Sequence, residues 1–250
     1  MDLGIEGRTA LVTGASRGLG LAISQVLARE GARVALSSRS RERLEEAAAT
    51  IGGETALFVA DSADLEQMRA LPAAVERELG AVDILVTNTG GPPPGGALDH
   101  SPEMWRAAYE TLVLAPRTLI EAALPGMRER GWGRIVNTAS VGIREPTGGL
   151  ALSNAHRMAT VGLFKTLATE VAGEGITLNT IATGRIATDR WAELVGSLDE
   201  AHRRAKDQVP AGRLGTPEEF GDLVAFLCSD RAAYLTGATI PLDGGISATP

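Results

Sequence analysis

Three glycines near the amino end are residues whose type and spacing suggest phosphate binding. Gly14, Gly18 and Gly20 lie between a short apolar stretch and one with apolar residues at helical spacing. Glycine allows positive φ where a strand turns sharply into a helix, and without a Cβ it lets a phosphate approach the backbone. The N–H groups and dipole at the start of the helix favour the same anion. The spacing therefore predicts a phosphate-binding turn, the alternative being an ordinary tight turn.

A second set of polar residues could act on a bound substrate. Ser140 and Ser153 carry hydroxyls, and Arg157 follows Ser153 one helical turn later. A serine hydroxyl can donate a hydrogen bond but is a very weak acid, and an arginine stays charged at working pH. Arg157 could still hold a ribose or an anionic group. Asn154 and His156 are polar neighbours, and the pKa of a histidine suits acid–base work; the alternative is a solvated or interface histidine.

The composition excludes several classes of protein. The 250 residues, 44% of them hydrophobic, suffice for one large α/β domain. A net charge of −7 without a basic run argues against nucleic acid as a partner. The single cysteine, Cys228, excludes an internal disulfide and lies in a predicted core helix, and three scattered histidines suggest no metal site. Because neither a signal peptide nor a membrane-spanning run is found, we expect a cytoplasmic protein.

Segments typical of strands and helices alternate along most of the chain. The predicted strands are Thr9–Thr13, Arg33–Ser37, Ala56–Ala60, Asp83–Thr87, Arg134–Thr138, Thr177–Ala182 and Thr239–Leu242. The predicted helices are Gly18–Glu30, Arg41–Ile51, Leu65–Leu79, Pro102–Glu129, Leu150–Ala172 and Pro217–Ser229. This alternation predicts a parallel sheet with helices on both faces. Without a linker or repeat, residues 1–250 are predicted to form a single α/β domain.

Two segments have the composition of loops over a site. Residues 90–96, rich in glycine and proline, follow the fourth predicted strand, where open α/β sheets place ligands. Residues 184–210 are mostly polar and are predicted to form a lid with short helices. The alternative for both segments is a surface insertion. Pro116 lies inside the predicted helix Pro102–Glu129 and is expected to kink or split it.

Further motifs run in order from Thr9 to Gly245. They are T-G-x-x-x-G-x-G at residues 13–20, an aspartate at 61, T-N-T-G at 87–90, a strand ending in serine at 133–140, R-L-G-T-P-E-E at 213–219 and L-D-G-G at 242–245. Together, at these intervals, they resemble the short-chain dehydrogenase/reductase family. The resemblance covers essentially the whole chain, and the combination is far more specific than any one motif.

The resemblance implies a fold, a reaction and a set of residues at the cofactor. The fold is a Rossmann-type doubly wound parallel sheet of seven strands in a three-layer α/β/α arrangement. The reaction transfers hydride between NAD or NADP and a carbonyl or alcohol carbon of a small molecule, as in 3-oxoacyl-(acyl carrier protein) reductases. The family also implies a homo-oligomer, a tetramer or dimer. The implied cofactor residues are Thr13, Gly14, Ser16, Arg17, Gly18, Leu19, Gly20, Ser38, Arg39, Asp61, Ser62, Asn88, Thr89, Gly90, Arg157, Thr183, Gly184 and Ile186.

The end of the second strand predicts which dinucleotide binds. An acid there would bond the ribose hydroxyls and repel a 2′-phosphate, whereas this chain has Ser38 and Arg39. Arg39 can pair with that phosphate, Ser38 leaves room for it, and Arg17 adds a second cation. We therefore expect NADP rather than NAD. The alternative is that Arg39, Arg41 and Arg43 form a solvated helix start.

The resemblance is incomplete at the catalytic end. The family uses a serine, matched by Ser140, and a tyrosine as general acid or base. A lysine one turn later lowers the tyrosine pKa, and an asparagine holds a water. The last three positions hold Ser153, Arg157 and Thr111 in this chain, so the catalytic candidates are Ser140, Ser153, Arg157 and Thr111.

Three functions are compatible with this pattern. The first is a reductase with an altered proton relay, in which Ser140 polarises the carbonyl, Arg157 stabilises the oxyanion, and water or His156 supplies the proton. The second is a protein that binds the dinucleotide without turnover, as a sensor or a partner subunit. The third is another carbonyl chemistry on the same scaffold. We favour the first because Ser140, Ser153 and Arg157 are all polar.

Overall fold

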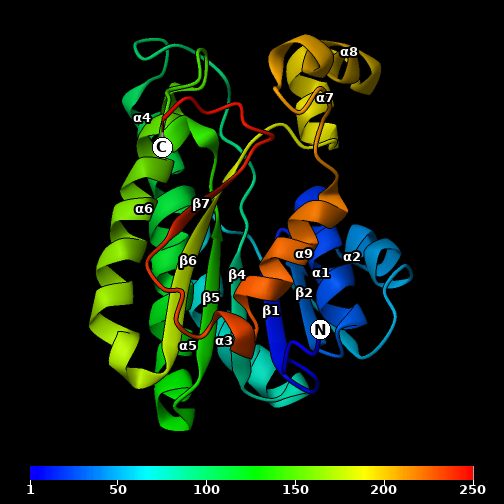
Figure 1. Ribbon diagram of the computed structural model, residues 1–250. Coiled ribbons are helices and arrows are strands. Elements are labelled where there is room, and N and C mark those ends of the chain that lie inside the picture. Colours follow the sequence, from blue (N-terminus) through cyan, green and yellow to red (C-terminus); the bar gives the residue numbers. More distant parts are fainter. Residues whose placement is uncertain (250) are drawn as a thin grey trace.

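Seven parallel strands form one sheet in the computed structural model, which describes residues 1–249 (Figure 1). The strands are β1 (Thr9–Thr13), β2 (Arg33–Ser38), β3 (Thr55–Val59), β4 (Val82–Thr87), β5 (Gly133–Thr138), β6 (Ile176–Thr183) and β7 (Thr239–Leu242). Their order is β3-β2-β1-β4-β5-β6-β7, and every neighbouring pair is parallel. The predicted Rossmann-type sheet is confirmed, and each strand lies where the sequence predicts it.

Helices cover both faces of this sheet, as Figure 1 shows. One layer contains α1 (Gly18–Arg29), α2 (Arg41–Ala48) and α9 (Pro217–Leu227). The other contains α3 (Leu65–Leu79), α5 (Ala115–Arg130) and α6 (Ala151–Val171). A shorter helix, α4 (Pro102–Tyr109), packs against α6. The arrangement is therefore the predicted three-layer α/β/α stack.

The core consists of two apolar layers, one on each side of the sheet. Successive residues of a strand point to opposite faces, so each strand feeds both layers. On β1, Val12 packs into the layer beneath α1 and α9, whereas Leu11 packs into the layer beneath α3 and α5. Cys228 belongs to the first layer and is fully buried, as predicted. Burial raises the pKa of its thiol to about 12.

The predicted helix Pro102–Glu129 is split, as Pro116 led us to expect. α4 ends at Tyr109, a π-helical turn spans Glu110–Leu114, and α5 begins at Ala115. A proline has no N–H to donate and obstructs the preceding turn, so it belongs at a helix start. Within the π turn, the Leu112 carbonyl accepts a hydrogen bond of 2.6 Å from the Thr160 hydroxyl of α6. The break is thus anchored by a neighbouring helix.

The segment predicted as a lid contains two helices, α7 (Asp189–Val195) and α8 (Leu198–Gln208). Figure 1 shows them beyond one end of the sheet, outside the two helical layers. They share a small apolar core with Leu214. Short 3₁₀ helices also lie at Val141–Ile143, Ala172–Glu174 and Asp230–Ala232. Within the described residues, no helix combines the length and apolar character of a membrane span.

The direction in which the chain crosses the sheet reverses between β1 and β4. From β1 the chain continues to β2 and β3 on one side, and from β4 to β5, β6 and β7 on the other. The loops that leave the carboxyl ends of β1 and β4 therefore diverge. Open α/β sheets bind ligands in the crevice at this point.

Candidate active site

The glycine turn after β1 has the backbone geometry that phosphate binding needs. Gly14 and Gly18 have φ values of +60° and +56°, which L side chains rarely adopt. A Cβ on Gly20 would overlap the Gly14 carbonyl oxygen, so the first turn of α1 presses directly on this turn. Ser16 and Leu19 are half-buried in the same stretch. Gly14 and Gly18 are therefore required by their backbone conformation, and Gly20 is required by the lack of space for a side chain.

Asn88, which follows β4 on the other side of the crevice, forms hydrogen bonds to the residues that begin the glycine turn. Its backbone N–H donates to the Thr13 hydroxyl oxygen at 2.9 Å, and that hydroxyl donates to the Asn88 carbonyl at 3.0 Å. The Asn88 side-chain amide donates to the Thr13 and Gly14 carbonyls at 3.3 and 3.4 Å. Three residues predicted to lie at the cofactor, Thr13, Gly14 and Asn88, are therefore in direct contact.

The amino end of α1 offers donors to an anion. Arg17 occupies its N-cap position without a side-chain capping bond, and the first turn carries no acidic residue. The N–H groups of that turn therefore keep their hydrogen-bonding capacity, next to the positive end of the helix dipole. A dinucleotide phosphate would fit this turn, because its oxygens match the donors and the glycines leave space.

α7 is tied to both loops that border the crevice. The Arg17 guanidinium lies 3.7 Å from the Asp189 carboxylate and 3.6 Å from that of Glu193. Arg190 in turn lies 3.8 Å from Glu193 and donates to the Pro92 carbonyl at 3.1 Å. In this structure the second cation predicted for NADP is therefore shared with α7.

The adenine end of the crevice is formed by the residues after β2 and β3. Ser38 is half-buried, and Arg39 is exposed with no carboxylate in ion-pair range among residues 1–249. Asp61 and Ser62 follow β3, the neighbour of β2 in the sheet. The Asp61 carboxylate accepts a bond of 3.0 Å from a backbone N–H two residues later. The predicted adenine-side residues thus lie at one edge of the sheet, with Arg39 available to a phosphate.

The chain after β6 borders the other end of the crevice. The Thr183 hydroxyl is buried and has no hydrogen-bond partner in the described chain, so a polar ligand atom would satisfy it. A Cβ on Gly184 would lie 2.5 Å from the Asp243 Cα, which places the C-terminal motif beside this loop. Ile186 is buried, and its backbone pairs with Gly215.

Arg157 joins three elements at the catalytic end. Its guanidinium donates to the Thr138 carbonyl at 2.5 Å, at the end of β5. It also donates to the Thr89 carbonyl at 3.5 Å, after β4, and to the Ser153 hydroxyl oxygen at 3.2 Å, in α6. Arg157 and Thr89, both predicted at the cofactor, are thereby brought together with the catalytic candidate Ser153.

The positive charge of Arg157 has no carboxylate beside it within the described residues. Burial of the guanidinium lowers its pKa to about 10, and the nearby Arg190 contributes to the same shift. Since this value is still well above neutral pH, the side chain stays charged. A fixed, half-buried positive charge stabilises negative charge that develops on a neighbouring oxygen.

Ser140 and Ser153 both present hydroxyls that can donate. The Ser140 oxygen accepts a bond of 3.2 Å from the Gly142 N–H, and the Ser153 oxygen accepts one from Arg157. No described acceptor takes the hydrogen of either hydroxyl. Each is half-buried, so each can donate to a substrate oxygen.

Thr111 is placed in the π-helical turn and has its own partner. Its hydroxyl donates to the Ala107 carbonyl at 2.6 Å, one turn earlier. Among the described residues, no hydrogen bond connects Thr111 to Ser140, Ser153 or Arg157. Its predicted catalytic role therefore has no contact to support it.

His156 packs between α6 and α4. Its Nδ1 lies 2.8 Å from the Leu152 carbonyl oxygen, and its ring lies 5.2 Å from that of Trp105 and 6.3 Å from that of Tyr109. Only 8% of the residue is exposed. On α6 it shares a row with Leu152, whereas Arg157 belongs to the adjacent row. The geometry favours packing over proton transfer and excludes the solvated alternative.

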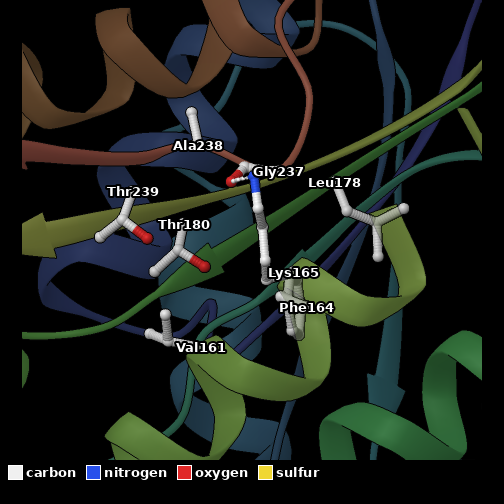
Figure 2. Close-up of a pocket in the computed structure, with 8 residues that line it drawn as sticks. All are labelled: Val161, Phe164, Lys165, Leu178, Thr180, Gly237, Ala238 and Thr239. Atoms are coloured by element: carbon white, nitrogen blue, oxygen red, sulfur yellow. Dashed lines mark hydrogen bonds between the residues drawn. The ribbon is translucent and has the colours of Figure 1, made fainter. Parts of the chain in front are cut away.

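Lys165, the next cation along α6, belongs to a different cavity. Figure 2 shows its side chain reaching Gly237, to whose carbonyl it donates at 3.0 Å. The cavity measures about 210 Å³ and is lined also by Val161, Phe164 and Leu178. None of the predicted site residues lines it, so Lys165 does not take the place of a catalytic lysine.

Sequence reasoning missed the residues that hold the loop after Ser140. Asn154 exchanges two hydrogen bonds with Thr147. The Glu145 carboxylate and the Arg144 guanidinium bind the backbone of the C-terminal segment. The pairs made by Glu145 and Arg144 are distant in sequence, and the Asn154–Thr147 pair, seven residues apart, follows no spacing rule. The one available signal was the polar Asn154 beside Ser153 in the first turn of a helix.

Known proteins resemble this chain along almost its whole length. A family model described as enoyl-(acyl carrier protein) reductase matches residues 14–247. The 3-oxoacyl-(acyl-carrier-protein) reductase FabG of Vibrio cholerae is 38% identical over 244 residues, covering 98% of this chain and 99% of the relative. Human dehydrogenase/reductase SDR family member 4 is 34% identical over 248 residues, with 96% and 88% covered.

Solved structures agree with these relatives. The L-sorbose reductase of Gluconobacter frateurii, complexed with NADPH and L-sorbose, has a TM-score of 0.95 and 35% identity, with both chains covered completely. YwfH, an NADPH-dependent reductase involved in bacilysin biosynthesis, has a TM-score of 0.92 and 28% identity, with 97% of this chain and 99% of that one covered. On the family match, the relatives and the shared fold, the chain belongs to the short-chain dehydrogenase/reductase family.

Proposed function

We propose that the protein is an NADP(H)-dependent oxidoreductase that reduces a carbonyl group of a small molecule or oxidises the corresponding alcohol. The observation that carries this proposal is the charged Arg157 bonded to the Ser153 hydroxyl oxygen at the carboxyl end of the sheet. The preference for NADP expected from Ser38 and Arg39 agrees with the NADPH named for two structural neighbours.

The cofactor would lie across the crevice between the loops after β1 and β4. The glycine turn and the amino end of α1 would hold its pyrophosphate. Arg39 and Ser38 would receive the 2′-phosphate, and Asp61 with Ser62 would border the adenine. Thr89 and Thr183 would face the nicotinamide end, where Arg157 lies.

The chemistry at that end follows from the donors present. Bound NADPH supplies a hydride for a carbonyl carbon. The Ser140 and Ser153 hydroxyls donate to the carbonyl oxygen, and Arg157 strengthens Ser153 as a donor by bonding its oxygen. The same positive charge stabilises the alkoxide that forms. Because Arg157 holds its proton and serine is a weak acid, water protonates the alkoxide to the alcohol.

A second candidate function is dinucleotide binding without turnover. This alternative is favoured because both tyrosines of the chain lie away from Arg157. Tyr109 packs against His156, and Tyr234 is fully exposed, so neither supplies a phenol beside Arg157. In this alternative the polar site would recognise the cofactor for a partner or a sensing step.

Two measurements separate these functions. A fluorescence titration with NADPH measures binding, and absorbance at the nicotinamide band measures turnover of a panel that contains L-sorbose, a 3-oxoacyl thioester, a diketone and a quinone. A reductase turns over at least one compound, and Ser140→Ala or Arg157→Ala lowers kcat by about 100-fold, the usual effect of removing one stabilising donor. Thr166→Ala, an exposed change elsewhere on α6, is the matched control.

Other results would instead support dinucleotide binding without turnover. Tight NADPH binding without turnover of any compound, together with activity gained by the double variant Ser153→Tyr/Arg157→Lys, would establish the binding protein. Activity of the unmodified chain that survives Arg157→Ala would contradict the proposed role of this residue.

Three further features belong to the proposal. The α7–α8 segment would act as a lid, because Arg17 and Arg190 tie it to both crevice loops. The protein would form a homo-oligomer in which two copies pack through α6. This helix exposes small or apolar side chains at Ala155, Met158 and Ala159. It would work in the cytoplasm.

A further inference from the structure

The loop between Ser140 and α6, residues 141–150, is held by a side chain that the mechanism above does not use. The Asn154 amide Nδ2 donates to the Thr147 carbonyl at 2.9 Å, and its Oδ1 accepts from the Thr147 N–H at 3.4 Å. One side-chain amide therefore pairs with both peptide groups of a single residue, as a neighbouring strand would.

Gly142 shows how closely this amide approaches Ser140. A Cβ on Gly142 would overlap the Asn154 Oδ1 and would lie 3.5 Å from the Ser140 Oγ. The Gly142 N–H donates to that Oγ at 3.2 Å. Gly142 thus lies between Ser140 and the Asn154 side chain. Because Gly142 has no side chain, the Asn154 amide can come this close to Ser140.

The outer side of the same loop is fixed to the C-terminal segment. The Glu145 carboxylate accepts bonds of 2.6 and 2.9 Å from the N–H groups of Ala248 and Thr249. Arg144 donates to the Thr239 carbonyl at 3.1 Å. These contacts tie the loop to the sheet edge but not to α6. Asn154 supplies a side-chain link between the loop and the helix that carries Ser153.

We propose that Asn154 is a positioning residue that fixes the Ser140 hydroxyl relative to Ser153 and Arg157. The inference rests on the proposed function, in which both hydroxyls donate to one carbonyl oxygen. Ser140 lies at the start of a loop and Ser153 lies on a helix, so their separation depends on how the loop is joined to that helix. A misplacement of about 1 Å in such a constellation costs roughly 100-fold in rate.

The contact itself is tested by hydrogen exchange of the Thr147 amide in Asn154→Ala and Asn154→Asp. The alanine variant removes both bonds, and exchange is expected to accelerate roughly tenfold. Trypsin should also cleave faster after Arg144 in the loosened loop. The aspartate variant is isosteric; it replaces the donor by a charged acceptor, and it can be measured where the alanine variant does not fold. Thr166→Ala on the same helix is expected to change neither measurement.

The positioning role is tested by kinetics with the compound of the panel that is turned over fastest. Asn154→Ala should lower kcat about tenfold or more, while the NADPH dissociation constant stays unchanged, because the glycine turn is untouched. Unchanged Thr147 exchange, or faster exchange with unchanged kcat and KM, would overturn the proposal. Absence of turnover in the unmodified chain would refute the proposed function, while the exchange rates would still decide whether Asn154 holds the loop.

Discussion

Arg39 and Arg157 differ in how much water reaches them, and this difference sets what each can do. Arg39 is exposed at the end of β2, so its charge is hydrated and its pairing with a small anion is weak. A 2′-phosphate offers two charges and a geometry that a guanidinium binds with two bonds. Arg157 is half-buried and bonded to three oxygens, burial lowers the pKa of its guanidinium, and its charge therefore acts more strongly on adjacent oxygens than that of Arg39.

Replacement of Arg39 by glutamate should separate the two dinucleotides. Arg39→Glu removes the phosphate partner and adds a repelling charge, so the dissociation constant for NADPH should rise about tenfold to 100-fold. That for NADH should change less than about threefold, because NADH lacks the phosphate. Fluorescence titration measures both constants. Arg43→Glu, one turn further along α2, is the control, and equal losses for both cofactors would contradict the assignment.

At the scale of elements, the R-L-G-T-P-E-E motif at residues 213–219 stabilises the start of α9. The Glu219 N–H donates to the Thr216 hydroxyl oxygen at 3.1 Å, and the Glu219 carboxylate accepts from the Thr216 N–H at 2.8 Å. This reciprocal pair caps α9, and Arg213 binds the same carboxylate at 2.6 Å. Gly215 meanwhile pairs with Ile186 after β6. The motif thus joins the start of α9 to a loop of the site.

The cap should give the protein a measurable acid sensitivity. The Arg213 and Thr216 hydrogen bonds lower the pKa of Glu219 from 4.5 to about 2. A lowered folded-state pKa means that this stabilisation is complete above pH 4.5 and is lost as the pH falls towards 2. Gln can still complete the capping box, but it loses the exposed ion pair with Arg213. Glu219→Gln should therefore lower the free energy of unfolding by about 0.5 kcal/mol at neutral pH and by less at pH near 3.

Denaturant unfolding at several pH values measures this difference. Glu46→Gln, an exposed change on α2 without an ion pair in the described chain, is the control and should be nearly neutral throughout. If the free energies of unfolding of the unmodified protein and Glu219→Gln differ by the same amount from neutral to acid pH, the assigned pKa is contradicted.

Elements were predictable from sequence where local chemistry determines them. The strand β1, the glycine turn and α1 follow from an apolar run, three glycines and helical spacing. The π-helical turn at 110–114 did not follow, because its carbonyl is held by Thr160 from another helix. The Asn154–Thr147 pair and the contacts of Arg17 with α7 were missed because they too join separate elements. The packing of His156 against α4 likewise depends on how two helices meet.

For the whole molecule, the question is which surface a second copy would cover. The net charge of −7 keeps copies apart unless apolar surface compensates. α6 exposes such surface, with Met158 at 50% exposure between two small exposed alanines. Small side chains let two helices approach closely, so this face suits the proposed homo-oligomer.

A charge placed on this face should break the oligomer. Met158→Asp would bury an unpaired carboxylate between copies, so the dissociation constant should rise at least about 100-fold. Sedimentation velocity over a range of concentrations measures it. Leu98→Asp makes a similar change at a fully exposed loop position and should leave the oligomer intact. Identical sedimentation of both variants and the unmodified chain would exclude α6 from the interface.

The three tryptophans of the chain lie in three separate surroundings. The guanidinium groups of Arg8 and Arg134 lie 4.0 and 4.4 Å from the centroid of the Trp132 ring, at the amino edge of the sheet. Trp191 belongs to α7, and Trp105 belongs to α4 and packs against His156 of α6. Cation stacking and burial set the emission of each ring differently. Intrinsic fluorescence of single-tryptophan variants therefore provides three built-in optical reporters, on the sheet edge, on α7 and on the contact between α4 and α6.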